Sequence, residues 1–110
     1  MKGLNKVSLI GHLGKDPEIR QISNEQQVAH VSLATTESYR DKTGKTVSQT
    51  DWHPLVLWGR LAVMASEHMR KGSLVYVDGK IKTRKYEDKL GQSRYVTEII
   101  VEKVILLPSK

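Results

Sequence analysis

Alternation of apolar and polar residues runs through most of this 110-residue sequence and constrains its fold more than any other feature. Successive side chains of a strand point to opposite faces, so alternation predicts half-buried β-strands. In the first such segment Val7, Leu9 and Leu13 share a face, and Gly11 between them predicts a bend or a close backbone approach. Five segments show the pattern, at residues 5–13, 28–39, 52–58, 74–86 and 95–107.

One segment between the third and fourth predicted strands has the period of a helix instead. Its helical stripe consists of Leu61, Met64, Ala65, His68 and Met69. We expect Lys71 and Gly72 to end this helix, with a cation in the last turn and glycine in the left-handed cap position. His68 lies on the apolar stripe, which favours a buried histidine. Five strands with a helix between the third and fourth predict an all-β fold, the five-stranded Greek-key barrel called the OB-fold.

The connecting segments are polar and are predicted to be loops. They span residues 14–27, 40–49 and 87–92, and the last is expected to close a hairpin at Leu90-Gly91. The sequence has no internal repeat and no low-complexity linker. We therefore expect residues 1–107 to form a single OB-fold domain, with residues 108–110 as a short end without a linker or acidic tail.

Composition narrows the class of function. Eighteen Lys and Arg against twelve Asp and Glu give a net charge of +6, which favours a polyanionic partner. The chain has no cysteine, and no apolar stretch approaches the roughly 20 residues that span a bilayer. The N-terminus resembles neither a signal peptide nor a transit peptide, so an intracellular protein without membrane contact is expected.

No pattern in the sequence indicates catalysis. The four histidines lack the spacing of a metal site, and no nucleophile motif is present. Thr43-Gly44-Lys45-Thr46 ends like a P-loop, but Tyr39 stands where that motif needs its first glycine. We therefore predict a protein that is not an enzyme and that has no metal and no cofactor.

The aromatic residues point to a nucleic acid. The chain has no Phe, and at least four of its six aromatic residues lie beside or near a basic residue or histidine. An aromatic ring can stack on a base while a neighbouring cation neutralises the phosphate, which is how single strands are held. The four candidate stacking residues are Tyr39, Trp52, Trp58 and Tyr86.

Strand alternation assigns these rings to faces. Trp52 and Trp58 share one face of their strand, and His53 lies on the other. Lys82, Arg84 and Tyr86 share one face of the fourth predicted strand, opposite Ile81 and Thr83. Cations and rings along one surface are what a groove for a single strand requires.

An ordered set of short motifs extends over essentially the whole chain. They are Asn5-Lys6-Val7, the stretch from Gly11 to Arg20, Leu33-Ala34-Thr35, Trp52-His53, Trp58-Gly59-Arg60-Leu61-Ala62, Arg70-Lys71-Gly72-Ser73 and Lys82-Thr83-Arg84-Lys85-Tyr86. This set resembles the bacterial single-stranded-DNA-binding protein (SSB) family. The resemblance implies an OB-fold subunit of a homotetramer, a dimer of dimers, that binds single-stranded DNA without sequence preference. It further implies a role in replication, recombination and repair, and a cytoplasmic, nucleoid-associated location in a bacterium.

The resemblance extends to individual positions. Trp52 matches the family directly, Tyr39 and Tyr86 stand where many members have Trp, and Trp58 stands where Phe is common. Basic residues expected to contact phosphates are Lys6, Arg40, Lys42, Lys45, Arg60, Lys71, Lys82, Arg84 and Lys85. Residues expected at subunit interfaces are Val7, Leu9, His53 and Tyr76.

The sequence also departs from the family. Pro54 occupies a position where members often have a basic residue, and its missing N–H predicts a sheet edge or a bulge there. His12 replaces a common asparagine. Family members typically continue into a flexible linker and an acidic tail that recruits other proteins. The sequence has no such tail after Pro108, so partners that depend on it are not expected.

Two other functions are compatible with an OB-fold. A primosome-type OB dimer that mainly docks proteins is disfavoured by the retention of all four stacking positions. An RNA-binding module of the cold-shock type is expected to carry Phe-rich motifs, and this chain has no Phe. Binding of oligo-dT, oligo-rU and duplex DNA distinguishes these functions.

Overall fold

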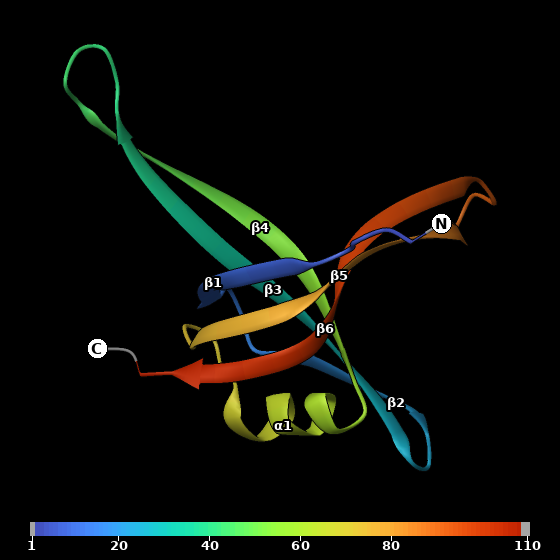
Figure 1. Cartoon of the computed structure of the whole chain (residues 1–110). Helices are drawn as coiled ribbons and strands as arrows, with labels where there is room; N and C mark the ends of the chain where they lie inside the picture. The colour runs from blue at the N-terminus through green and yellow to red at the C-terminus, as the bar shows by residue number, and fades with distance from the viewer. Residues whose placement is uncertain (1, 109–110) are drawn as a thin grey trace.

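The computed structural model of the protein describes residues 2–108, which form six strands and one short helix (Figure 1). In chain order they are β1 (Val7–Leu13), β2 (Glu18–Ser23), β3 (Gln26–Arg40), β4 (Thr46–Trp58), α1 (Arg60–His68), β5 (Leu74–Glu87) and β6 (Ser93–Leu107). Within residues 2–108 no helix has the length and apolar character needed to cross a membrane.

Five strands close into a barrel. Their order is β1-β5-β6-β4-β3, and β1 returns to β3 where His12 pairs with Ala34. Gly11 makes this closure possible, because a Cβ at Gly11 would overlap the Ala34 carbonyl group. The close backbone approach predicted at Gly11 is confirmed. The all-β OB-fold is confirmed as well, since α1 follows the third of the five barrel strands.

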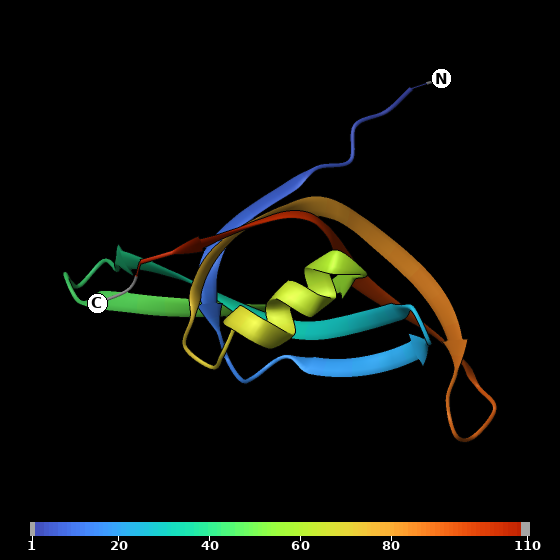
Figure 2. The same ribbon diagram turned by 90° about the horizontal axis from the view of Figure 1, so that it is seen from below.

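The hydrophobic core fills the barrel, and α1 lies across one end of it (Figures 1 and 2). Leu33, Leu55 and Leu57 are at most 1% exposed, and burial of each such side chain stabilises the fold by about 1.5–3 kcal/mol. From the helix end, Ala62, Ala65 and Met69 complete the core. On the strands, core residues at alternating positions determine which face points into the barrel.

The C-terminal end of the helix differs from the prediction. α1 ends at His68, and Met69 already has an extended backbone with φ −105° and ψ 137°. Met69 therefore turns into the core, and the His68 side chain is left 60% exposed. The predicted buried histidine is wrong for this reason. Gly72 does have a left-handed backbone, but in a separate turn closed by the Ser73 N–H and the Arg70 carbonyl.

The predicted loop at residues 14–27 was wrong, because it contains β2. This strand pairs antiparallel with β3 and forms a hairpin beside the barrel. All six of its residues are exposed. Ile19 and Ile22 stand at positions of opposite parity, so the segment has no alternation from which a strand could be predicted.

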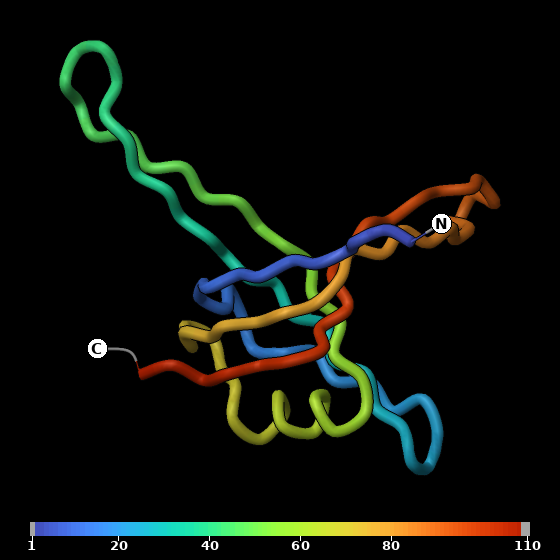
Figure 3. The backbone as a smooth tube through the Cα atoms, viewed as in Figure 1, coloured from blue at the N-terminus to red at the C-terminus, as the bar shows by residue number. Residues whose placement is uncertain are grey.

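Two ribbons extend beyond the barrel, one from β3 and β4 and the other from β5 and β6 (Figure 3). The β3–β4 pairing continues to Arg40 and Thr46, so the loop predicted at residues 40–49 shrinks to a short turn. The hairpin predicted around Leu90-Gly91 is confirmed, since Glu87 pairs with Ser93 across it.

The two ribbons end in turns of the same structure. In each, an aspartate Oδ1 accepts hydrogen bonds from the backbone N–H groups two and four residues later. Asp41 does so at 2.9 and 3.0 Å, and Asp88 at 2.9 and 3.0 Å. A glycine with positive φ stands three residues after each aspartate, Gly44 in one turn and Gly91 in the other. Each turn therefore holds its ribbon tip in one conformation and presents a lysine, Lys42 or Lys89, at the same position.

Candidate nucleic-acid interface

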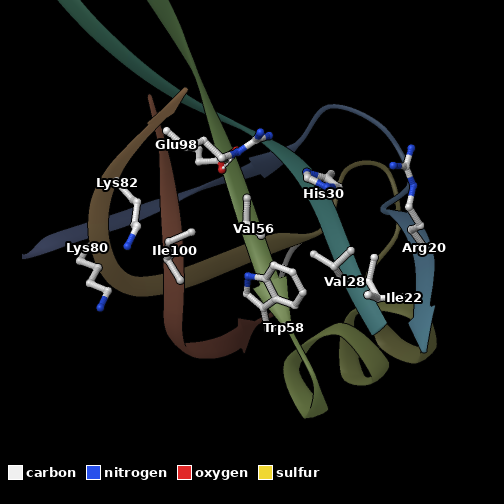
Figure 4. Close-up of a pocket in the computed structure, with 11 residues that line it drawn as sticks. Arg20, Ile22, Val28, His30, Val56, Trp58, Lys80, Lys82, Glu98 and Ile100 are labelled. Carbon is white, nitrogen blue, oxygen red and sulfur yellow. Dashed lines mark hydrogen bonds and ion pairs between the residues drawn. The ribbon is translucent and has the colours of Figure 1, made fainter. Parts of the chain in front are cut away.

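An open groove of about 530 Å³ lies on the outer faces of β4, β5 and β6 (Figure 4). The β2–β3 hairpin, which the sequence did not predict, forms its other wall. Apolar side chains and one indole ring make up the floor, and cations lie at the sides. The lining residues are Arg20, Ile22, Val28, His30, Val56, Trp58, Lys80, Lys82, Arg84, Glu98 and Ile100.

Strand alternation brings these side chains together. On β4, Leu55 and Leu57 point into the core, which turns Val56 and Trp58 toward the groove. On β5 the residues of even number face outward, and their partners on β6 lie beside them: Lys80 pairs with Ile100 and Lys82 with Glu98. The predicted comb of Lys82, Arg84 and Tyr86 is confirmed as one face of β5.

Trp58 is the ring of this groove. Its indole is 43% exposed and lies near Val56 and Ile100 on the groove floor in Figure 4. Val28 is directly opposite Trp58 on β3. A ring that is held on apolar neighbours and keeps part of its surface open can accept a base by stacking.

Trp52 lies on the same face of β4 but outside the groove. Its ring, 57% exposed, covers Gly14 and borders a hollow with Lys15 and Ser32. A further hollow that Pro54 lines connects the two sites, because it shares His30 with the groove and Lys15 and Ser32 with the Trp52 hollow. We call this continuous path from Trp58 over Pro54 to Trp52 the ring track.

Pro54 keeps its place in the ladder. Its partner on β3 is Ser32, and the β3–β4 register runs past it without a shift. Of the two predicted alternatives, a sheet edge or a bulge, the bulge is therefore ruled out. β4 is also not an edge of the sheet, but its pairing with β6 is confined to Leu55 and Val56. Pro54 therefore pairs with a strand on one side only. This agrees with the reason for the prediction, because proline has no N–H to donate to a strand on its other side.

Tyr39 is not brought together with the other rings. It pairs with Val47, and the unbroken register places it on the ribbon face opposite Trp52. Its side chain is 54% exposed near the ribbon tip, where Arg40, Lys42 and Lys45 also lie. The tip of this ribbon therefore carries one ring and three cations at a distance from the groove, with Arg40 on the face opposite Tyr39.

Lys85 likewise lies on the face of β5 opposite Lys82. Its partner across the ribbon is Tyr95, which is 71% exposed. Three further predicted phosphate contacts stand outside the groove. Lys6 precedes β1, Arg60 is the first residue of α1, and Lys71 lies in the turn after α1, where its N–H donates to Asp16 Oδ1 at 2.8 Å.

Arg84 has two protein partners. Its Nε donates to Glu98 Oε1 at 2.8 Å, and its guanidinium carbon lies 5.9 Å from the centre of the Tyr86 ring. Tyr86 is 43% exposed. Arg94, directly opposite Tyr86 on β6, is bound to Asp88 at 3.0 Å. Hydrogen bonds from Arg94 and from the turn backbone lower the pKa of Asp88.

Sequence reasoning missed part of the groove. Lys80 could have been found, because it has the parity of Lys82 and Arg84. Arg20 and His30 could not, since their place depends on the unpredicted pairing of β2 with β3. Glu98 carried no signal at all, as an acidic residue in a basic surface has no motif.

The residues predicted at subunit interfaces divide into two groups. Val7 and Leu9 pack against the barrel core, so their side chains face inward. Tyr76 faces outward from β5 and donates a hydrogen bond to Asp78 Oδ1 at 2.7 Å. His53 lies opposite the rings, as predicted, with its Nε2 2.8 Å from Thr35 Oγ1.

A closed five-stranded barrel with aromatic and basic residues along its outer faces defines an OB-fold protein of the nucleic-acid-binding class. The sequence model of the single-strand binding protein family matches residues 4–107, and the chain belongs to this family. The resemblance found in the sequence is thereby confirmed. Proteins of this family bind DNA and are not enzymes, so no catalytic function is expected for this chain.

Two solved structures resemble the chain over almost its whole length. A Plasmodium falciparum SSB in complex with single-stranded DNA matches with a TM-score of 0.87 and 38% identity, over 98% of each chain. A deletion mutant of the single-stranded DNA binding protein from Thermus aquaticus matches with a TM-score of 0.84 and 28% identity. The match covers 98% of this chain and 52% of the Thermus aquaticus chain.

Proposed function

We propose that this protein binds single-stranded DNA irrespective of its base sequence and protects it during replication, recombination and repair. The observation that carries the proposal is the ring track, in which Trp58 and Trp52 lie on one face of β4 beside the basic groove. The match to an SSB in complex with single-stranded DNA supports the same ligand. A location in a bacterial nucleoid stays a prediction.

The chemistry of the groove suits a single strand better than a duplex. Bases of a single strand are free to stack on Trp58 and Trp52, whereas those of a duplex are not. Lys80, Lys82 and Arg20 line the groove together with Trp58 and can neutralise phosphates. Stacking and phosphate contacts do not depend on base identity, so little sequence preference is expected.

We expect the strand to contact both ribbons. Tyr39 faces away from the ring track, and so does Lys85 on the other ribbon. If these residues bind DNA as predicted, the strand has to pass around the ribbons. Wrapping of this kind accounts for binding residues on both ribbon faces.

The proposal is tested by titrating the protein with oligo-dT, oligo-rU and duplex DNA of equal length while tryptophan emission is followed. We expect strong quenching and the tightest binding with oligo-dT. Tighter binding of the duplex would contradict a stacking mechanism, and tighter binding of oligo-rU would indicate an RNA-binding module instead.

We further propose that the protein forms a homotetramer that is a dimer of dimers. The first support is an open strand edge. β1 pairs with β3 only at His12 and Leu13, so its residues from Val7 to Ile10 have β5 on one side and no strand on the other within residues 2–108. Two copies can pair such edges antiparallel about a twofold axis. Val7 and Leu9 contribute to this contact through their backbone.

The second support is an apolar surface on the outside of the barrel. Ile10, Tyr76 and Ile105 lie side by side across β1, β5 and β6, and Ile10 and Ile105 are 56% and 43% exposed. A second twofold contact through this surface, together with the β1 edge, generates a closed tetramer. Native mass measurement tests this assembly.

A further inference from the structure

Glu98 is the one charged residue among residues 2–108 that is buried, with 7% exposure, and it lies in the wall of the basic groove. It stands directly opposite Lys82 on β5. Burying a carboxylate costs free energy unless a charged partner and hydrogen bonds compensate it. A negative group at this place also repels phosphates. Its position is therefore costly for stability and, at first sight, for DNA binding as well.

The partner of Glu98 is Arg84. The Arg84 Nε donates to Glu98 Oε1 at 2.8 Å, while the arginine side chain stays 51% exposed and the glutamate side chain 8%. A guanidinium has its donors in a rigid planar fork. With the Nε edge held by Glu98, the two Nη groups have no protein acceptor among the described residues and remain available to a ligand.

Tyr86 also restricts the position of the Arg84 side chain. The guanidinium carbon lies 5.9 Å from the centre of the Tyr86 ring, within the range of a cation–π contact. Arg84 thus has two protein contacts in the absence of DNA, one to a carboxylate and one to a ring. A side chain that is already held loses less conformational freedom when it binds a ligand.

We propose that Glu98 is a positioning residue for DNA binding: it holds Arg84 by the Nε edge so that both Nη groups face the phosphates of the single strand. Glu98 therefore strengthens binding in spite of its negative charge. The inference rests on the proposed function, because it names how one cation of the proposed DNA groove is oriented.

Charge alone predicts the opposite sign. If Glu98 only repelled phosphates and neutralised Arg84, its removal would tighten binding. Two substitutions separate these effects, since Glu98→Gln and Glu98→Ala both remove the charge, whereas only glutamine keeps an oxygen that can accept from Arg84 Nε. Glu102→Ala is the matched control, because Glu102 is exposed on the same strand outside the groove lining.

We expect Glu98→Ala to weaken binding of poly-dT by about three- to tenfold, the cost of ordering one free arginine side chain. Glu98→Gln should stay within about twofold of the wild-type affinity, and Glu102→Ala should not weaken binding. Tighter binding by Glu98→Ala, or equal affinities of the alanine and glutamine variants, would overturn the proposal.

A double-mutant cycle gives a readout that a purely structural role would not move. In the wild-type background Arg84→Ala should flatten the salt dependence by about 0.7 in slope, one phosphate on a single strand. In the Glu98→Ala background the same substitution should change the slope much less. An equal change in both backgrounds overturns the proposal.

Arg84→Lys tests the same idea while it leaves a cation beside the buried Glu98 carboxylate, and an unchanged Tm would show that folding is intact. Lysine keeps the charge but has a single ammonium group. It cannot donate to Glu98 from one edge and to a phosphate from another, as the planar guanidinium can. It should lose nearly as much affinity as Arg84→Ala, and wild-type affinity of the lysine variant would overturn the proposal. If the wild-type protein itself does not bind poly-dT, the proposed function fails; if it binds without coupling between Arg84 and Glu98, only this inference fails.

Discussion

The indole of Trp52 covers Gly14 and fills the space that a side chain at Gly14 would need. A Cβ at Gly14 would lie 2.7 Å from the Trp52 Cη2 atom. Trp52 extends from the outer face of β4, while Gly14 follows the last residue of β1. The orientation of a proposed stacking ring therefore depends on the absence of a side chain in a neighbouring loop.

Gly14→Ala should displace the Trp52 ring. Because this ring is 57% exposed, it can swing outward, and the stability change should stay near the roughly 0.5 kcal/mol typical of surface substitutions. We expect a shift of tryptophan emission and weaker binding of poly-dT with little change in Tm. Gly3→Ala is the control, since a Cβ at Gly3 has no neighbour within 4 Å. Unchanged emission and affinity in the Gly14 variant would show that this contact does not hold the ring.

Trp58→Ala should lower the affinity for poly-dT by about 1–3 kcal/mol, the usual contribution of one ring stacked on a base. Trp58→Phe should retain most of the affinity, because a smaller ring still offers a flat face. Fluorescence titration and calorimetry measure both variants. Val63→Ala, an exposed apolar residue on α1, is the control. If Trp58→Ala binds as tightly as this control, the groove is not where bases stack.

Lys82→Ala should reduce the dependence of affinity on salt. Each phosphate neutralised on a single strand contributes a slope of about 0.7 in log affinity against log salt, and loss of one contact removes that amount. The change should be equal for dT and dA tracts. Lys2→Ala removes the same charge from an exposed residue before β1 and should leave the slope unchanged. A change of base preference without a change of slope would mean that Lys82 reads bases.

Much of the barrel could be predicted because its strands carry a buried face. In β4 and β5 the alternation of core residues such as Leu55 and Val77 fixed both the strand and the face that the groove residues occupy. The comb of Lys82, Arg84 and Tyr86 followed from the same parity. β2 carried no such signal, because all six of its side chains are exposed.

The face that Tyr39 occupies followed from parity, although the motifs did not show it. Tyr39 has the odd parity of core residues on β3 such as Leu33, whereas Trp52 on β4 has the parity opposite to Leu55. The length of the β3–β4 ribbon could not be predicted, because its outer residues are almost all exposed and have no buried face. Glu98 was missed for a different reason, since a buried ion pair across two strands has no local sequence pattern.

Asp88 should stabilise the β5–β6 turn only while it is ionised. Its pKa is lowered below the ordinary value of 3.8 by Arg94 and by backbone N–H groups of the turn. A lowered pKa means stability that is present above about 3.8 and lost as the pH falls through the still lower folded value. Asp88→Asn should therefore have a lower Tm than the wild type at neutral pH, with the difference vanishing in acid. Glu87→Gln is the control, and a difference that persists in acid would contradict the role of the charge.

Ile10→Asp should break the proposed tetramer. Ile10 lies beside Tyr76 and in line with Ile105 on the outer face of the barrel, and a carboxylate there would be buried without a partner at a subunit contact. Because Val7 and Leu9 on the same strand face the core, the substitution leaves the barrel interior unchanged. Light scattering should give a smaller mass than for the wild type, with a similar Tm for the barrel core.

Val63→Asp is the control, because it places the same charge on the exposed face of α1 and should leave the mass unchanged. A wild-type protein that is a monomer at micromolar concentration would contradict the assembly itself, whereas an unchanged mass of Ile10→Asp would place the second contact elsewhere.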